Sequence, residues 1–542
     1  MRTPLFRSLR QLIADLKVSQ RTATPLDVVR EERRVRAAQR KSDLISRRSL
    51  LGGAAVAAGL LALPKGARAA ASQPKVASVG AGMAGMACAG LLQSKGVSFT
   101  VYEASTRIGG RMYSNNDRTY WDEGQVTEWG GELIDTNHRT MHRLARKYGL
   151  VLDDLTSTDA AGADEVYKVG GAYYPKTQAD EDFLAMLDVV DDDEAAAGYP
   201  TTWDSYTTAG RALDQMSVRD WIATRVPGGH RSPLGQVLDI AYNIEYGAET
   251  DVQSALNLLY LLAYQPAPHK LATFGESDER YHIRGGNQQL PQAIAATLPS
   301  GTIEFGMKLV KLARTPAGRT ACTFVRGGST TEVVYDYVVL CMPFAMLASV
   351  DYAQAGFDDR KTLAIRELGR GHNAKVQLQF RTRSWDGRGA WPGVSNGTTF
   401  ADTGYQASWE PTRGQPGTAG ILNLYSGGAG TDALKTDVPF ATSSYNKTRQ
   451  DAERGLAQIS QVFPGLDWNG KATASIWPKN PFTQHSYAFW KVGQYTAFGG
   501  YEGVRQGGVL FAGDHTSQDF QGFMNGAASE GERAALELVK LL

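Results

Sequence analysis

The residues best suited to bind a phosphate form a glycine-rich turn, Gly80-Ala81-Gly82-Met83-Ala84-Gly85. The turn follows residues 75–79, an apolar run with the length of a buried strand, and it leads into small, helix-forming residues. In such a unit the first glycine permits a tight turn and the second lets backbone N–H groups approach a pyrophosphate. The third glycine lets the helix pack on the strand. The spacing therefore predicts a dinucleotide-binding strand, turn and helix.

A second apolar strand, residues 98–102, ends at Glu103, whose carboxylate is placed to accept the ribose hydroxyls of the nucleotide. This fingerprint fits NAD and FAD equally, but the next residues separate the two. The segment Glu103-Ala104-Ser105-Thr106-Arg107-Ile108-Gly109-Gly110-Arg111 resembles one found in the flavin amine oxidase superfamily, which includes monoamine, polyamine and L-amino-acid oxidases. Its glycine pair allows a second close backbone approach, and its last arginine offers a guanidinium to a phosphate.

The resemblance extends along nearly the whole chain beyond residue 70, because further motifs follow in the family's order. They are Trp129-Gly130-Gly131-Glu132-Leu133, Gly285-Gly286-Asn287-Gln288-Gln289-Leu290, Val338-Val339-Leu340-Cys341-Met342-Pro343, Leu510-Phe511-Ala512-Gly513-Asp514-His515-Thr516, Gly522-Phe523-Met524-Asn525-Gly526-Ala527 and Gly531-Glu532-Arg533-Ala534-Ala535. The resemblance implies FAD, with its adenine beside a strand near Leu309 and a ribityl hydroxyl on Asp514. It also implies a helix starting at residues 522–524 whose N-terminus points at the flavin.

The residues expected to bind FAD come from all of these motifs. They are Gly80, Ala81, Gly82, Ala84, Gly85, Glu103, Ala104, Gly110, Arg111, Gly130, Gly131, Glu132, Leu133, Leu309, Gly513, Asp514, Gly522, Phe523 and Met524. Ser486 occupies the position where some monoamine oxidases carry the cysteine that tethers FAD. Serine cannot form that thioether, so we expect FAD to bind without a covalent link.

The first candidate for chemistry is Lys375, on residues 374–380, which alternate like a strand, with Trp385 ten residues later. A lysine in such a pattern is often simply solvent-facing. The spacing to the tryptophan resembles that of the family's flavin-facing lysine, which holds a water against flavin N5. We therefore expect Lys375 to be catalytic.

Three aromatic residues are the other catalytic candidates. Trp477 and Tyr487 stand ten residues apart, as in the family, and Phe523 occupies a position that is often tyrosine in amine oxidases. The resemblance implies that Tyr487 and Phe523 form two walls of an aromatic cage that orients an amine and excludes water. The alternative is that these rings belong to the core.

The resemblance implies that a neutral amine loses its Cα hydrogen as a hydride equivalent to FAD. The resulting imine is hydrolysed to a carbonyl compound and ammonia, and molecular oxygen is reduced to hydrogen peroxide. We expect an oxidase of L-amino acids, which yields 2-oxo acids. The alternatives are an amine or polyamine oxidase or dehydrogenase acting on substrates without a carboxylate, and, from another class, a non-catalytic exported flavoprotein.

The identity of the substrate is the least determined point. An amino acid needs a counter-ion for its carboxylate, and Leu133 stands where venom-type L-amino-acid oxidases have an arginine. The segments 131–135 and 402–410 nevertheless resemble exported bacterial L-amino-acid oxidases, which would have to find this counter-ion elsewhere. Glu132 and Asp135 could favour a basic side chain, and they could equally be helix-capping and surface charges.

The first 69 residues read as an export signal. Arg47 and Arg48 precede an uncharged apolar stretch, residues 50–63, which is short for a membrane span, and a small-x-small cleavage site follows at residues 67–69. This resembles a twin-arginine leader, here with a long basic N-terminal extension. Residues 1–69 hold 15 Lys and Arg against 5 Asp and Glu, so the remainder of the chain is acidic. We expect export by the twin-arginine machinery to a periplasmic or secreted location, without a stable membrane span.

The expected fold is α/β with α+β: a Rossmann-like FAD-binding domain interleaved with a substrate-binding domain of mixed sheet and helices. The FAD-binding domain is assigned to residues 70–147, 275–345 and 475–542, and the substrate-binding domain to 148–274 and 346–474. We expect residues 180–197 to be a solvated acidic loop or helix face, residues 256–264 a buried helix or pocket wall, and residues 396–415 turns. A net charge of +1 gives no sign of nucleic-acid binding, three cysteines cannot build a disulfide framework, and no metal-ligand spacing is present. The oligomeric state stays open, with a homodimer among the alternatives.

Overall fold

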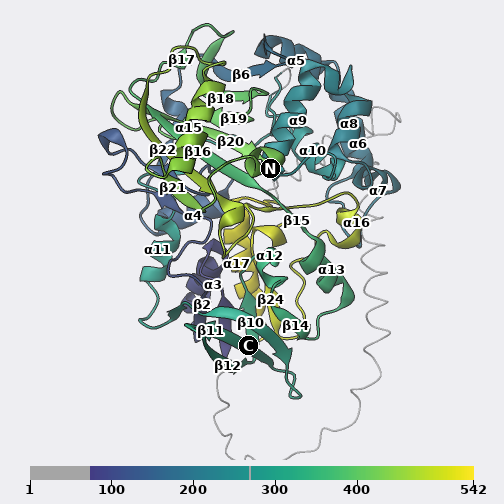
Figure 1. Cartoon of the computed structure of the whole chain (residues 1–542). Helices are drawn as coiled ribbons and strands as arrows, with labels where there is room; N and C mark the ends of the chain where they lie inside the picture. Colours follow the sequence, from purple (N-terminus) through teal and green to yellow (C-terminus); the bar gives the residue numbers. More distant parts are fainter. Residues whose placement is uncertain (1–73, 268–269) are drawn as a thin grey trace, which may run out of the picture. The chain divides into compact units, whose positions relative to one another are not determined.

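The computed structural model describes residues 74–267 and 270–542, which belong to one compact unit, Pro74–Leu542 (Figure 1). The predicted leader, residues 1–69, lies outside the described residues. The division of the rest into an FAD-binding and a substrate-binding domain stays a prediction.

A parallel five-stranded sheet contains the predicted dinucleotide-binding unit. Its order is β24 (Val509–Phe511), β13 (Tyr337–Leu340), β1 (Val76–Val79), β2 (Phe99–Glu103) and β9 (Ile303–Phe305). Helix α3 (Met83–Ser94) follows β1 and packs against α17 (Met524–Val539). A Cβ at Gly85 would lie 1.9 Å from the carbonyl oxygen of Gly80, and one at Gly531 would lie 2.1 Å from that of Ala84. Glycine is therefore required where α3 meets the turn before it and the C-terminal helix.

A mixed nine-stranded sheet forms the second layer of the molecule. Its path is β21 (Phe440–Thr442), β22 (Trp468–Ile476), β16 (Asn373–Phe380), β20 (Gly420–Gly427), β19 (Ala407–Trp409), β18 (Val394–Ala401), β6 (Ala163–Val169) and β7 (Ala172–Tyr174), with β17 (Asp386–Gly387) paired to β18. The expectation of turns over residues 396–415 is wrong for residues 396–401 and 407–409, which belong to β18 and β19, whereas bends and a turn do occur at residues 402–405 and 411–414. Strand β18 joins the sheet between β19, which follows it directly in the chain, and β6, which lies more than 200 residues earlier.

Helices from residues 176–262 lie beside the mixed sheet, at the upper right of Figure 1. They are α5 (Lys176–Leu184), α6 (Leu187–Ala197), α7 (Thr208–Asp214), α8 (Val218–Arg225), α9 (Pro233–Tyr246) and α10 (Ala255–Leu262). Residues 180–197 thus fall within helices, and α10 is almost entirely buried, as expected. Ser or Thr caps the N-terminus of α7, α8, α9 and α10 by accepting a backbone N–H.

The remaining elements complete the frame around these layers. A four-stranded sheet contains β12 (Ser329–Tyr335), β11 (Thr320–Arg326), β10 (Lys308–Arg314) and β14 (Asp351–Gln354), and strand pairs form between β3 (Ser114–Asn115) and β4 (Thr127–Glu128), β5 (Leu152–Asp154) and β8 (Tyr281–Ile283), and β15 (Gly369–Arg370) and β23 (Ala488–Phe489). The other α-helices are α4 (Arg139–Lys147), α11 (Gln289–Ala296), α12 (Phe344–Leu347), α13 (Asp359–Glu367), α14 (Gly428–Asp432), α15 (Asn446–Ile459) and α16 (Gln494–Phe498).

The fold class expected from the sequence, a Rossmann-like parallel sheet combined with a mixed sheet and helices, is confirmed. Within residues 74–267 and 270–542, no helix has the length and apolarity that crossing a bilayer requires. The same residues contain no group of three metal-ligating side chains.

Candidate active site

A cavity of about 600 Å³ lies between the carboxyl ends of the parallel strands and the mixed sheet, and this volume falls within the range of cofactor sites, roughly 300–1,000 Å³. It is lined by every residue that the sequence predicts for the site except Ala81 and Gly85. Those two lie directly behind the wall: Ala81 is fully buried, and its N–H donates to Glu103 Oε2 at 2.8 Å. The fold thus brings the sequence-distant motifs to one place.

One end of the cavity has the form of a phosphate cradle. Gly80 has a φ of +105°, and a Cβ at Gly110 would lie 3.1 Å from Gly82 Cα, so the two glycine-rich turns lie against each other. Helix α3 begins here with Gly82 as its N-cap, without a side-chain cap and without an acidic residue in its first turn. Its first N–H groups are therefore available to an anion.

The adenine end lies beside Glu103. The N–H of Met307 donates to the carbonyl oxygen of Glu103 at 2.9 Å, which holds the start of β10, and with it Leu309, next to the end of β2. Glu103, Ala104 and Leu309 all line the cavity there. This is the arrangement expected for a ribose and adenine site.

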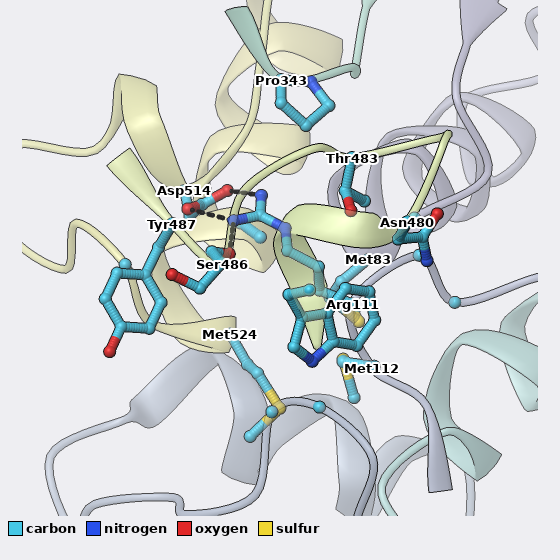
Figure 2. A pocket seen from close by; sticks show the side chains of 18 of the residues that line it. Met83, Arg111, Met112, Pro343, Asn480, Thr483, Ser486, Tyr487, Asp514 and Met524 are labelled. Carbon is cyan, nitrogen blue, oxygen red and sulfur yellow. Dashed lines mark hydrogen bonds and ion pairs between the residues drawn. The ribbon is translucent and has the colours of Figure 1, made fainter. Parts of the chain in front are cut away.

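Arg111 and Asp514 form an ion pair in the cavity wall (Figure 2). The Arg111 guanidinium also donates to the carbonyl oxygen of Ser486 at 2.6 Å. Burial alone would raise the pKa of Asp514, but the positive charge of the paired Arg111 outweighs burial and holds this pKa below its ordinary value. The carboxylate is therefore ionised and can accept a hydroxyl.

His515 is a cavity residue to which the sequence motifs assigned no role. Its side chain is 2% exposed and lines the cavity, and neither ring nitrogen has a hydrogen-bond partner among the described residues. Burial lowers the pKa of His515 to about 4, so the imidazole is neutral at pH 7 and offers one donor and one acceptor. The sequence signal that could have placed His515 at the cofactor is its position directly after Asp514 in the family motif.

These features fit FAD. The glycine cradle, the uncapped helix N-terminus and the orphaned imidazole of His515 each leave room or hydrogen-bonding capacity for a bound group. Gly80, Gly82 and Gly110 would surround its pyrophosphate, Glu103 would hold its ribose, and Asp514 its ribityl chain.

Lys375 lies on β16 and points into the cavity wall rather than into solvent, with an exposed fraction of 6%. Its Nζ donates to Glu132 Oε2 at 2.5 Å and to the carbonyl oxygen of Gly130 at 2.9 Å. The other carboxylate oxygen of Glu132 accepts from Trp409 Nε1 at 2.8 Å. Glu132 is therefore the counter-ion of Lys375, which the sequence did not indicate, and it is not a surface charge.

The three predicted aromatic residues line the same cavity. The Tyr487 hydroxyl contacts that of Tyr425 at 2.9 Å and donates to the carbonyl oxygen of Ile244 at 2.9 Å, while Trp477 Nε1 donates to the carbonyl oxygen of Trp129 at 2.9 Å. Phe523 lies at the N-cap of α17. Tyr487 thus has a fixed orientation, and its role as a cage wall with Phe523 stays a prediction.

Ionisable residues that the sequence analysis did not single out surround the substrate end. They are Glu165, Glu245, Glu279 and Arg413, and they come from four separate segments. Asp135 joins them: it is buried, and it accepts from Ser277 Oγ at 2.9 Å and from the Glu279 N–H at 3.0 Å. The alternative of a surface charge at Asp135 is therefore wrong.

Replacing Lys375 with Met should leave Glu132 as a buried charge without its counter-ion and destabilise the fold by about 3–5 kcal/mol. The double variant Lys375→Met/Glu132→Gln should regain most of the lost free energy of unfolding, because no unpaired charge remains. It should not regain substrate turnover if Lys375 holds the water that hydrolyses the imine. Urea unfolding and peroxide release check both. The control is Lys447→Met, which breaks a solvent-exposed pair with Asp437 and should cost less than about 1 kcal/mol. Recovery of turnover in the double variant would reduce Lys375 to a structural counter-ion.

Replacing His515 with Phe should have opposite effects on the two forms of the protein. The apoprotein should gain about 1 kcal/mol, because a buried polar ring without partners is removed, whereas the dissociation constant for FAD should rise about tenfold. Thermal unfolding of the apoprotein and fluorescence titration with FAD measure the two changes. His372→Phe, at a ring that faces Asp432 near the surface, is the control. An unchanged FAD affinity would show that the imidazole does not contact the cofactor.

Comparison with known proteins agrees with this site. The family profile described as flavin containing amine oxidoreductase matches residues 83–539. The L-amino-acid oxidase of Mus musculus is 24% identical over 478 residues, covering 86% of this chain and 70% of that protein, and the nicotine dehydrogenase of Pseudomonas putida is 26% identical over 523 residues, covering 92% and 98%. The structure of cyclohexylamine oxidase from Brevibacterium oxydans shares the fold with a TM-score of 0.72 at 20% identity, covering 86% of this chain and 99% of the other. The chain belongs to the flavin-containing amine oxidoreductase family, whose members act on CH–NH₂ groups.

Proposed function

We propose that this oxidoreductase is an FAD-dependent oxidase that deaminates L-amino acids to 2-oxo acids, with release of ammonia and hydrogen peroxide. Bound FAD would supply the two-electron acceptor for the Cα–H bond of the substrate. The aromatic faces of Tyr487 and Phe523 would orient the amine and exclude water, and Lys375 would hold the water that hydrolyses the imine.

The observation that carries the amino-acid assignment is the position of Arg413. Its guanidinium lines the substrate part of the cavity and offers the counter-ion that Leu133 does not. Its Nη1 lies 3.3 Å from Asp159 Oδ2, while its Nε is buried without a hydrogen-bond partner among the described residues. A guanidinium with an unused donor is suited to a carboxylate.

The relatives divide on this point. One is named for L-amino acids, whereas nicotine and cyclohexylamine, in the names of the others, carry no carboxylate. The second candidate is therefore an oxidase or dehydrogenase of amines without a carboxylate, and the excess of carboxylates in the cavity favours a cationic substrate in either case.

We also propose that FAD is held without a covalent bond. The Ser486 hydroxyl donates to the carbonyl oxygen of Gly371 at 2.9 Å and contacts Asn373 Oδ1 at 2.5 Å, so it is engaged by the protein. The neighbouring His485 has Nδ1 at 2.7 Å from the carbonyl oxygen of Thr483, and burial lowers its pKa to about 3. The His515 experiment needs an apoprotein, which is prepared by removing FAD under mild denaturation. A covalent link would prevent this removal.

Replacing Arg413 with Met should lower kcat/KM for L-amino acids relative to amines without a carboxylate by about tenfold to a hundredfold, the range for a charge-assisted hydrogen bond. Arg413→Lys should restore part of the ratio. Peroxide-coupled rates with paired amino acids and their decarboxylated amines measure it. Arg381→Met, at a solvent-exposed pair with Asp467, is the control. An unchanged ratio, or turnover of amines alone, would contradict the amino-acid assignment.

We further propose export by the twin-arginine route, on the basis of Arg47 and Arg48 before an uncharged apolar stretch. Replacing both with Lys should keep the protein in the cytoplasm, as measured by cell fractionation. Arg33 and Arg34 form a matched control pair, because no such stretch follows them directly. Export that survives the Arg47/Arg48 change would exclude this route.

A further inference from the structure

The carboxylates at the substrate end of the cavity gather from distant parts of the chain. Glu245 is the penultimate residue of α9, Glu279 lies in the loop before β8, and Asp135 follows residues 130–133 of the predicted flavin-contacting segment. The pKa of Glu245 is raised by burial and then by the charges of Glu279 and Asp135, so these groups lie within electrostatic reach of one another.

Two of these carboxylates have no hydrogen-bond or ion-pair partner within residues 74–267 and 270–542. Asp135 accepts hydrogen bonds from Ser277 and Glu279, whereas the carboxylates of Glu245 and Glu279 have none among the described residues. The same residues provide no cation within ion-pair distance of either. Burial, followed by repulsion from Asp135, raises the pKa of Glu279 to about 8, and burial raises that of Asp135 to about 7.

Three of the cations in the cavity wall already have carboxylate partners. Lys375 is held by Glu132, Arg111 by Asp514, and Arg413 contacts Asp159. Arg413 lowers the pKa of Glu279 through space but does not form an ion pair with it. The cavity therefore has a deficit of positive charge at Glu245 and Glu279.

This deficit lies beside the predicted cage. Tyr487 donates to the carbonyl oxygen of Ile244, the residue next to Glu245, and its hydroxyl contacts that of Tyr425. Burial is the main cause of the raised pKa of Tyr425 and Tyr487, and the charges of Glu245 and Glu279 raise it further. The two carboxylates therefore lie within electrostatic reach of the tyrosine hydroxyls. A substrate amine held at Tyr487 could extend its far end toward them.

We propose that Glu245 and Glu279 bind a second cationic group of the substrate, which makes a basic L-amino acid the preferred substrate. An ammonium or guanidinium there would ionise the carboxylates and form charge-assisted hydrogen bonds with them. A neutral aliphatic side chain would leave the two carboxyl groups desolvated and unpaired, which costs free energy. The amino-acid part of this inference rests on the proposed function; the distal-cation part does not.

Four substrates of similar length separate the two parts. L-Lysine carries both the carboxylate and the distal ammonium, L-norleucine lacks the ammonium, cadaverine lacks the carboxylate, and pentylamine lacks both. We expect kcat/KM for L-lysine to exceed that for L-norleucine by about tenfold to a hundredfold. L-Lysine should also raise the melting temperature of the anaerobic flavoprotein more than L-norleucine does.

The variants Glu245→Gln and Glu279→Gln assign the effect to these residues. Each replaces a carboxyl group that a bound ammonium would ionise with a neutral amide of the same shape, so folding should be retained, and each should reduce the ratio of kcat/KM for L-lysine to that for L-norleucine about tenfold. The control is Glu181→Gln, on the exposed face of α5, which should leave the ratio unchanged.

The outcomes are distinguishable. Turnover of L-norleucine at least as fast as that of L-lysine would overturn the inference and leave the amino-acid proposal standing. Turnover of cadaverine and pentylamine without either amino acid would overturn the amino-acid proposal, and the cadaverine-to-pentylamine ratio in the same variants would then decide the distal-cation site. A preference for L-lysine that persists in both glutamine variants would show that other residues bind the ammonium.

Discussion

Charged groups inside a protein are costly unless they have a partner, and this constraint organises the cavity. Lys375 on β16 is neutralised by Glu132 from the glycine-rich segment, which ties the mixed sheet to the predicted cofactor site. Arg111 and Asp514 tie the turn after β2 to the segment after β24. Each pair joins segments hundreds of residues apart, so the two pairs hold the walls of the cavity together. Because these residues are charged, the same pairs also determine the charge inside the cavity.

Apart from Ala81 and Gly85, the residues predicted for the cofactor end line one cavity, and the sequence signals for them are local. A tight turn, a helix N-terminus and a nearby carboxylate require particular residues at fixed spacing, so Gly80, Gly82, Gly85 and Glu103 can be recognised without a structure. The same holds for Lys375, whose position on an alternating strand was visible, although its burial and its pairing with Glu132 were not. From the sequence alone, a lysine on such a strand is expected to face solvent. Its counter-ion Glu132 lies 243 residues away in the chain and can be identified only in the folded structure.

The substrate end could not be predicted in this way. Glu245, Glu279 and Arg413 come from a helix end and two loops with no common spacing, and only the folded chain brings them to one cavity. The prediction of turns was wrong at residues 396–401 for a related reason: their Gly and Thr content favours turns, and one of the two partner strands of β18, β6, lies far away in the sequence. His515 lies in a predicted motif, but the sequence could not show that its imidazole is buried without a hydrogen-bond partner among the described residues.

The departure at Leu133 can be understood from the charges around it. Lys375 and Trp409 already engage both carboxylate oxygens of Glu132, so this carboxylate has no free oxygen with which to neutralise a further buried cation such as an arginine. Arg413 does not depend on this carboxylate, because Asp159 holds one of its nitrogens and leaves Nε unused. With the counter-ion for an α-carboxylate on this separate segment and the unpaired carboxylates near the hydroxyl end of the Tyr425–Tyr487 pair, the cavity offers separate positions for an amine, a carboxylate and a second cation. Discrimination among amines would then depend on charge placement more than on the volume of the cavity, since a neutral side chain of equal size fits the space but leaves Glu245 and Glu279 unpaired.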